Sequence, residues 1–302
     1  MNNAYSVFRR FTLVLISLPL LLAGCVRDDN NDCPATYSDL EVVAHWPEGA
    51  TVPSAIRVVF YSVAGGNSTI MDLPPQGGKI SIRTGTYSIL VLNSDTQRIL
   101  YSNRGSYNKY DAYTSTVGVS IPGYPNITTC FVSPDDLWLE SIDSYRIRKD
   151  TKVIDVYPEK RVYQYYIVAE MEGIEYVKSA AGVVTNLKES ILLHDCSANV
   201  VGTVQLQSSR IPGAVLFAFK SFGVETDKRH EIIFTASSAS RTYQFDFDIT
   251  SQLNAIPHGG TIYLREGIVI DPDEAIDEDG FDVSVGGWDD IPVFLPPILA
   301  EP

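Results

Sequence analysis

Short runs of β-branched and aromatic residues recur along almost the whole chain, separated by clusters of Gly, Pro, Asn and Asp. In the clearest run, Tyr243, Phe245 and Phe247 alternate with polar Gln244 and Asp246. An apolar side chain at every second position is typical of a half-buried strand, because successive side chains of a strand point to opposite faces. Helical spacing is sparse, with at most a short helix at residues 250–256. The pattern therefore predicts an all-β protein built as a sandwich.

Several segments carry this strand signal. In the first half, strands are expected at residues 40–45, 56–62, 79–82, 87–93, 98–102, 113–120 and 137–140. In the second half, residues 200–207 and 281–285 alternate in the same way. Residues 162–171 and 214–222 are more continuously apolar, as expected of central strands that are covered on both faces.

A chain of 302 residues is long enough for about two domains. A charged run that contains Arg146, Arg148, Lys149 and Asp150 separates two blocks that are rich in strand signal. We therefore expect an N-terminal β-sandwich domain over residues 39–149 and a C-terminal one over residues 150–302.

The first 25 residues have the composition of an export signal. Arg9 and Arg10 precede a short apolar stretch at residues 11–22, and Leu-Ala-Gly leads directly into Cys25. The apolar stretch is too short to span a bilayer. This box resembles the lipobox of bacterial lipoproteins, which implies removal of residues 1–24 and acylation of Cys25. The alternative is an ordinary secretory signal that happens to lie beside a cysteine.

Residues 25–38 contain almost no aliphatic side chain and are expected to form a flexible acidic tether. Asp28, Asp29 and Asp32 resemble the acidic export signal of surface lipoproteins of the Bacteroides group. A solvated linker is the other interpretation.

The chain as a whole is acidic, with a formal net charge of −14. This charge argues against binding of nucleic acid and against electrostatic docking on anionic lipid.

Three cysteines remain after Cys25, so an oxidising compartment allows one disulfide and leaves one thiol. A bridge between Cys33 and Cys130 is favoured, because both fall in the first predicted domain whereas Cys196 falls in the second. The alternative is that all three are buried as small hydrophobic residues.

Catalytic and metal-binding motifs are sparse. The four histidines form no HExxH and no pairing with Cys at ligand spacing, and there is no Gly-x-Ser-x-Gly, phosphate loop or Cys-x-x-Cys. We therefore expect the chain to have no enzymatic activity and to bind no cofactor. A pair of carboxylates for glycoside hydrolysis is still an open alternative, because such pairs meet in space and not in sequence. The acidic run at residues 271–280 is either a solvated loop or a Ca²⁺ site formed by Asp271, Asp273, Asp277 and Asp279.

Several longer motifs occur together with the lipobox and an early Trp46-Pro47. They are GTYSILVLNSDT at 85–96, VKSAAGVVTNL at 177–187, FDFDIT at 245–250 and GFDVSVGGWDDI at 280–291. In this combination the chain resembles the fimbrillin-like and fimbrial anchor lipoproteins of Bacteroides-type bacteria. The resemblance implies two tandem transthyretin-like, Ig-like antiparallel β-sandwich domains. It also implies a lipid-anchored, surface-exposed location at the outer membrane.

The same resemblance implies a non-enzymatic role as a fimbrial anchor, accessory or structural subunit in adhesion and assembly. Its partners would be other fimbrial subunits, joined by β-strand addition, in which a donor strand satisfies an open sheet edge. The candidate removable strand is residues 40–45, and the candidate donor strand is residues 290–295. No basic residue directly follows residue 45, and Arg57 is the first one beyond it. The sequence therefore favours an anchor-like subunit that keeps its first strand.

A second class of function is a surface lipoprotein that binds a glycan or another host ligand. Tyr107, Tyr110, Tyr113 and Tyr124 flank a loop rich in Gly and Asn, and exposed tyrosine rings can stack on sugars.

Overall fold

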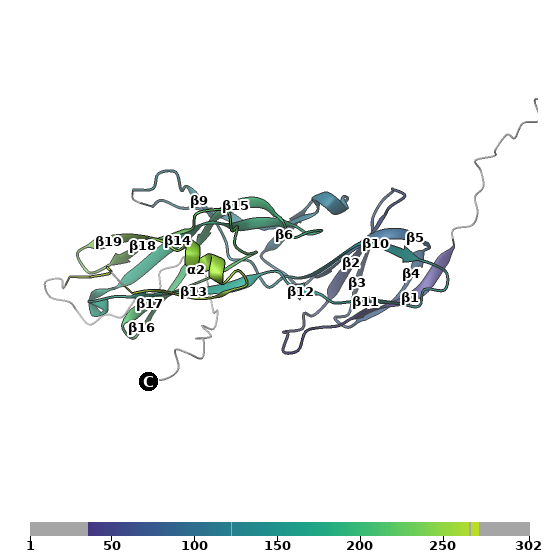
Figure 1. Ribbon diagram of the computed structural model, residues 1–302, viewed down its shortest axis with the longest axis horizontal. Helices are drawn as coiled ribbons and strands as arrows, with labels where there is room; N and C mark the ends of the chain where they lie inside the picture. The colour runs from purple at the N-terminus through teal and green to yellow at the C-terminus, as the bar shows by residue number, and fades with distance from the viewer. Residues whose placement is uncertain (1–35, 122, 266, 272–302) are drawn as a thin grey trace, which may run out of the picture. The chain divides into compact units, whose positions relative to one another are not determined.

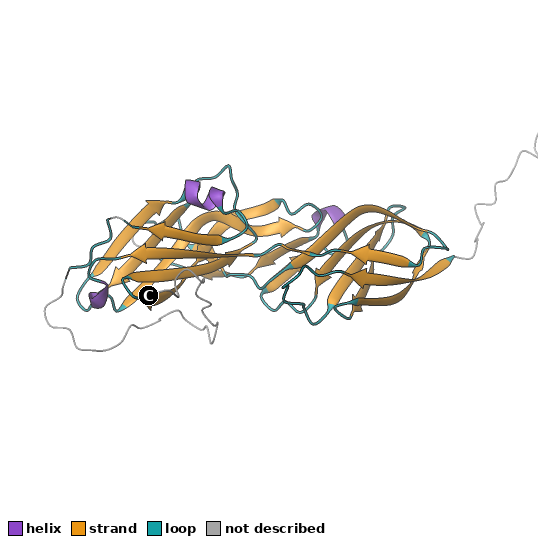
Figure 2. Ribbon diagram, turned by 60° about the horizontal axis from the view of Figure 1, so that its bottom comes forward, coloured by secondary structure: helices purple, strands orange, loops and turns teal. Residues whose placement is uncertain are grey.

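The computed structural model describes residues 36–121, 123–265 and 267–271. These residues form strands with very little helix, which confirms the predicted all-β class (Figure 2). The helical turns are few and short: η1 (Tyr107–Lys109), η2 (Ile174–Tyr176) and α2 (Thr250–Ala255). The last of these confirms the short helix expected at residues 250–256.

The N-terminal strands contribute to two sheets. The first sheet has three strands in the order β11 (Val153–Val156), β1 (Tyr37–Ala44) and β4 (Gly77–Arg83). The second has five strands in the order β12 (Glu159–Lys160), β10 (Trp138–Ile147), β5 (Gly85–Asn93), β2 (Ile56–Ser62) and β3 (Thr69–Leu73).

These two sheets enclose one hydrophobic core. Leu40 and Val42 enter it from β1, and Val58 and Ile89 enter it from the facing sheet. Burial alternates strictly along most of β1, since one face of the strand meets the core and the other meets solvent. The predicted strand at residues 40–45 is therefore a sandwich strand with a buried face.

The remaining strands form two further sheets (Figure 1). The four-stranded sheet has the order β16 (Gln207–Ile211), β17 (Ala214–Ser221), β13 (Tyr163–Glu170) and β20 (Gly260–Leu264). The eight-stranded sheet runs through β19 (Thr242–Asp248), β18 (Glu231–Ser237), β14 (Ser179–Leu192), β15 (Ala198–Gln205), β9 (Thr129–Phe131) and β8 (Thr116–Gly118), and it also contains β7 (Asp111–Thr114) and β6 (Ile99–Ser102).

The second core lies between these two sheets. Tyr165 and Ile167 of β13 and Phe217 of β17 pack against Val184 of β14 and Phe234 of β18. As predicted from their continuous apolar runs, β13 and β17 are the central strands of their sheet. The predicted alternation of β19 is also confirmed, because its aromatic side chains are half-buried while its Gln and Asp side chains are exposed.

A third core covers the opposite face of the five-stranded sheet. Leu90 and Leu92 of β5 point into it, whereas Ile89 and Val91 of the same strand point into the first core. Residues that follow position 150, including Val162, Ile191 and Phe222, complete this third core. The middle of β5 is therefore buried on both faces.

Strand pairing crosses the boundary that the charged run suggested. β11 and β12 follow position 150 but pair with β1 and β10, while β6, β7, β8 and β9 precede it and join the eight-stranded sheet. The described residues from Ser38 onward form one compact unit. A division into domains at residues 149 and 150 stays a prediction.

Three predicted strands differ in their extent. The strand expected at 200–207 ends at Gln205 in β15, and Gln207 begins β16 of the other sheet. The strand expected at 113–120 is two strands, β7 and β8, which part at Ser115 because β7 pairs with β6 and β14 whereas β8 pairs with β9. The strand expected at 137–140 continues to Ile147, through an irregularity after Ile142, because β5 offers a partner along its whole length. Residues 281–285 lie outside the described residues.

Candidate functional site

β1 is the middle strand of its sheet, and this position makes it the candidate site for assembly. It pairs in parallel with β11, with Glu41 opposite Val153 and Ala44 opposite Val156, and β4 lies on its other side. A strand between two neighbours cannot leave without opening a gap that both of them line. The gap would expose unpaired backbone groups and apolar side chains together.

The buried face of β1 contributes directly to the first core. Leu40, Val42 and Ala44 are 4%, 1% and 9% exposed. They pack in a core that also contains Ile80 and Ile154 from the two neighbouring strands. Burying an aliphatic side chain contributes about 1.5–3 kcal/mol. The hydrophobic face of β1 is therefore a substantial part of this core.

Polar contacts hold both ends of β1. At the start, the Ser38 hydroxyl donates to the Thr151 carbonyl at 3.0 Å. Just beyond the end, the backbone N–H of His45 donates to the Val156 carbonyl at 2.8 Å. The His45 ring stacks on Tyr157 at 4.7 Å between centroids, and its Nε2 lies 2.8 Å from Asp155.

The next residue, Trp46, ties the end of β1 to the five-stranded sheet. Its indole Nε1 donates to the Pro75 carbonyl at 2.8 Å. Its ring meets Trp138 edge to face at 5.6 Å. Trp46, which belongs to the Trp46-Pro47 pair noted in the sequence, therefore links the end of the first strand to the facing sheet.

Gly77 of β4 provides the tightest contact with β1. A Cβ atom at this position would lie 1.9 Å from the Val42 carbonyl oxygen, and the residue has a φ of +96°. Glycine is needed here for both reasons, since it has no Cβ and adopts positive φ without strain. In sequence, Gly77 is only one residue of a cluster of Pro and Gly at 74–78 between two expected strands, because close backbone approach has no signature in a single sequence.

The sheet edges are the other surfaces at which a strand could be added. β3 and β12 end the five-stranded sheet, and β16 and β20 end the four-stranded one. Ile70 of β3 is 46% exposed. Asp72 on the same strand forms an ion pair with Arg57 of β2, with 2.8 Å between the carboxylate oxygen and the guanidinium Nε. The hydrogen bond from Arg57 lowers the pKa of Asp72. Charged residues of this kind are a usual means of protecting an edge.

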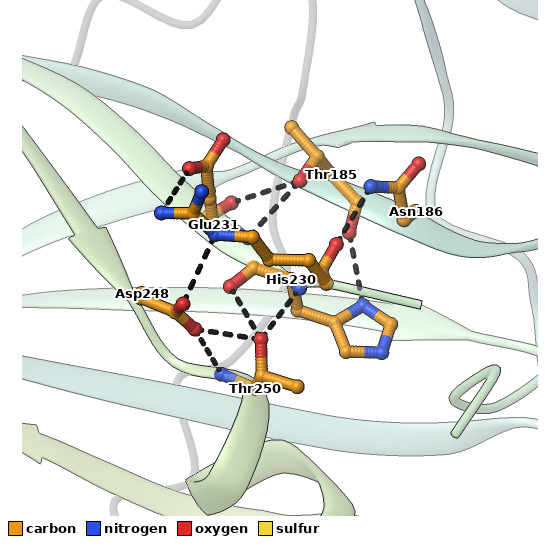
Figure 3. A network of polar contacts seen from close by, with 7 residues as sticks. Thr185, Asn186, His230, Glu231, Asp248 and Thr250 are labelled. Carbon is orange, nitrogen blue, oxygen red and sulfur yellow. Dashed lines mark hydrogen bonds and ion pairs between the residues drawn. The ribbon is translucent and has the colours of Figure 1, made fainter. Parts of the chain in front are cut away.

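A buried histidine takes part in a polar network of the sheets around the second core (Figure 3). His230 is fully buried, with Nδ1 3.2 Å from the Thr185 carbonyl and Nε2 3.0 Å from the Glu225 carbonyl. The Thr250 hydroxyl donates to Asp248 at 2.6 Å and fixes the start of α2. Because both ring nitrogens lie within hydrogen-bond distance of backbone carbonyl oxygens, His230 is structural.

The predicted modification sites fall mostly outside the described residues. Cys25, Cys33, Asp273, Asp277 and Asp279 lie there, and Asp271 alone of the acidic run is described. The lipidation, the disulfide and the Ca²⁺ site all stay predictions. Among the described residues no group of three or more His, Cys, Asp or Glu side chains is placed to hold a metal ion.

Cys130 and Cys196 are free thiols in the structure. Cys130 is 1% exposed, and burial raises the pKa of its thiol to about 11. Burial also raises the pKa of Cys196. Cys130 is therefore a small buried hydrophobic residue and Cys196 is half-buried, while the bridge from Cys130 to Cys33 stays a prediction because Cys33 lies outside the described residues.

Of the four tyrosines expected to be exposed, the structure contradicts the expectation for Tyr110. Tyr110 is 1% exposed and belongs to the third core, and Tyr107, Tyr113 and Tyr124 are only partly exposed. The Tyr107 hydroxyl is engaged with Ser141 and Asp143, and burial together with Asp143 raises its pKa to about 12. The aromatic rings near this loop were needed to fill a core, which the spacing of tyrosines in the sequence could not show.

One polar network was not foreseen from the sequence. The Asp136 carboxylate accepts hydrogen bonds from Lys220 at 2.7 Å and from Lys160 at 2.9 Å. Burial raises the pKa of Asp136, but the two lysines outweigh it and leave the pKa below its ordinary value. These residues are far apart in sequence, so no local motif identifies them.

Within the described ranges, no helix is long and apolar enough to cross a membrane.

A sequence comparison identifies the family. The profile of a family described as "Domain of unknown function (DUF5119)" matches residues 24–206. A protein of Bacteroides ovatus described as a candidate fimbrium anchoring subunit, Fim4B, is 33% identical over 184 residues, which are 59% of this chain. The matched part is 54% of that relative, so the chain spans about half its length.

Solved structures share the fold. A candidate adhesin from Bacteroides ovatus is 23% identical with a TM-score of 0.66, over 84% of this chain and 99% of that one. A second candidate adhesin from Bacteroides ovatus is 9% identical with a TM-score of 0.53, over 83% of this chain and 94% of that one. At these identities the likeness shows the arrangement of strands and not a shared ligand or partner.

Proposed function

The chain belongs to the family described as "Domain of unknown function (DUF5119)", and from this premise we propose that it is a non-enzymatic fimbrial subunit that anchors a fimbria at the cell surface. The 33% identity to a candidate fimbrium anchoring subunit supports the role. The observation that carries it is β1, the middle strand of its sheet, with Leu40 and Val42 in the core. A subunit that keeps this strand has a complete first sandwich and needs no donor strand there.

Lipid attachment at Cys25 would provide the anchor. Acyl chains bury about 0.8 kcal/mol per CH₂ group in a bilayer, so several chains hold a protein at the outer membrane. The expected tether, whose last two residues Tyr37 and Ser38 already belong to β1, would then join the lipid to that strand. A Cys25→Ala variant grown with labelled palmitate tests this: the unmodified chain takes up label and the variant takes up none. Label in the variant would contradict the anchor.

The finer fold that we propose is a pair of transthyretin-like sandwiches. The three- and five-stranded sheets around the first core would form one, and the four- and eight-stranded sheets around the second core would form the other. The third core, shared by β5 with Val162 and Ile191, would join the two.

Residues 36–160 carry every strand of the first sandwich together with β6 to β9 of the eight-stranded sheet. Expressed alone, they lack Val162, Ile191 and Phe222 of the third core, so we expect them to be less stable than the full chain. Equal stability would contradict the shared core.

Partners would be other fimbrial subunits, joined by strand addition at a sheet edge while β1 stays in place. The predicted donor at residues 290–295 lies outside the described residues, so the edge that takes part in assembly is not assigned. Affinity purification of the chain from material sheared off the cell surface tests the role. We expect fimbrial subunits to be recovered with it. Recovery of the chain always alone would contradict the role.

A further inference from the structure

A pocket of about 300 Å³ opens on the face of the four-stranded sheet that points away from the second core. Gln207 of β16, Ala218 of β17 and Tyr166 of β13 lie directly opposite one another across three neighbouring strands. The short side chain of Ala218 in the middle of this row leaves a depression between two larger side chains. Gln164 and Lys220, paired two positions along, continue the same face.

Two segments from outside the sheet form the remaining walls. They are residues 133–135, which precede β10, and Gln97 with Arg98, which precede β6. One Asp135 oxygen accepts the backbone N–H groups of Gln97 and Arg98 at 2.7 and 2.6 Å. The Ser133 hydroxyl accepts the backbone N–H of Lys220 at 3.0 Å, beyond the end of β16. These bonds hold the walls in place before any ligand arrives, which lowers the entropy lost on binding.

Several polar groups of the pocket are already engaged, including the amide of Gln164, which donates to the carbonyls of Tyr165 and Phe219. Lys220 pairs with Asp136, and Asp135 faces the backbone donors described above. Among the described residues, the amide of Gln207 and the hydroxyl of Tyr166 form no hydrogen bond. An amide donates and accepts, and so does a hydroxyl. The pocket therefore offers two groups that can each donate and accept, which suits a ligand that has several hydroxyls.

We propose that this pocket binds a saccharide unit, with sugar hydroxyls bonded to Gln207 and Tyr166 and the sugar lying over Ala218. Its volume lies at the lower end of the ≈300–1,000 Å³ of small-ligand sites. A peptide strand fits less well, because strand addition needs a row of unpaired backbone groups and the pocket floor is formed by side chains across paired strands. The proposal does not depend on the fimbrial role.

Saturation-transfer NMR on the full chain tests it, with the methyl glycosides of glucose, galactose, mannose, fucose and N-acetylglucosamine as probes. We expect transfer to at least one glycoside. Ala218→Leu fills the floor without removing a polar group and should abolish transfer. Gln207→Ala and Tyr166→Phe should each weaken binding by about three- to tenfold, as loss of one hydrogen bond does. Ser209→Leu, on the same face of β16 but outside the pocket, is the control and should bind normally.

Thermal unfolding of each variant shows whether it is folded. If Ala218→Leu is not folded, Gln207→Ala is used in its place to test the pocket. Absence of transfer from all of the glycosides would overturn the proposal, as would transfer that survives Ala218→Leu. The synthetic peptide of residues 290–295 is the remaining probe. The pocket is a peptide site, and the proposal is wrong, if three results occur together. The peptide binds the unmodified chain, it does not bind the Ala218→Leu variant, and none of the glycosides shows transfer. The outcomes with the glycosides do not bear on recovery of fimbrial subunits with the chain.

Discussion

Gly77 lies so close to Val42 that a Cβ atom on it would stand 1.9 Å from the Val42 carbonyl oxygen. Gly77→Ala must therefore displace β1 or β4. We expect the free energy of unfolding to fall by more than the ~1–2 kcal/mol that a positive φ alone costs a non-glycine residue. Gly66→Ala is a matched control, because Gly66 has a φ of +98° but nothing within 4 Å of its Cβ position. Equal losses in denaturant unfolding would show that β1 is not held in this way.

β5 offers a test of the third core. Ile89 and Leu90 are both fully buried, but they point into different cores. Ile89→Ala and Leu90→Ala should each cost about 2–5 kcal/mol, through lost burial and the cavity left behind. Val63→Ala, at a residue 63% exposed, should stay within about 0.5 kcal/mol. A negligible loss for Leu90→Ala in chemical denaturation would mean that this face of the sheet is not buried in solution.

Asp136 gives the fold a dependence on pH. Its folded pKa lies below its ordinary value, so its carboxylate contributes stability above the unfolded pKa of about 3.9, and that contribution is lost as the pH falls through the folded pKa. Because the side chain is 35% exposed, we expect Asp136→Asn to lose only about 1 kcal/mol at neutral pH. The difference in melting temperature should close in acid. Asp150→Asn, at an exposed residue, is the control, and a gap that persists in acid would contradict the assignment.

Cys130 should be unreactive in the folded protein. Its burial and its pKa of about 11 leave almost no accessible thiolate at pH 8. Alkylation followed by mass spectrometry should modify it only after unfolding, with no reductant needed. Labelling of the native protein would contradict the burial. If Cys130 of the unfolded chain labels only after reduction, the bridge to Cys33 predicted from the sequence is present.

The alternation of polar and apolar residues was enough to predict the class, the short helix and most strands. It worked for β19, because one face of that strand is half-buried and the other is exposed. It could not show which strands pair. The parallel pairing of β1 with β11 joins Glu41 to Val153, and no local pattern relates two residues so far apart.

The candidate site was predictable in part. Residues 40–45 could be recognised as a strand, and the family resemblance suggested why that strand matters. Gly77 was recognised only as a turn residue. The tyrosines were misjudged, because a tyrosine beside a Gly-rich loop looks the same in sequence whether its ring is exposed or, like Tyr110, fills a core. The row of Gln207, Ala218 and Tyr166 needed the strand register.

We propose that the chain works at the cell surface as a lipid-anchored fimbrial subunit that keeps β1. Mass spectrometry of the N-terminal peptide of the protein recovered with fimbriae tests it most directly. The account predicts a chain that begins at acylated Cys25 and still contains Leu40, Val42 and Ala44. A chain that begins beyond Ala44, without lipid, would contradict it.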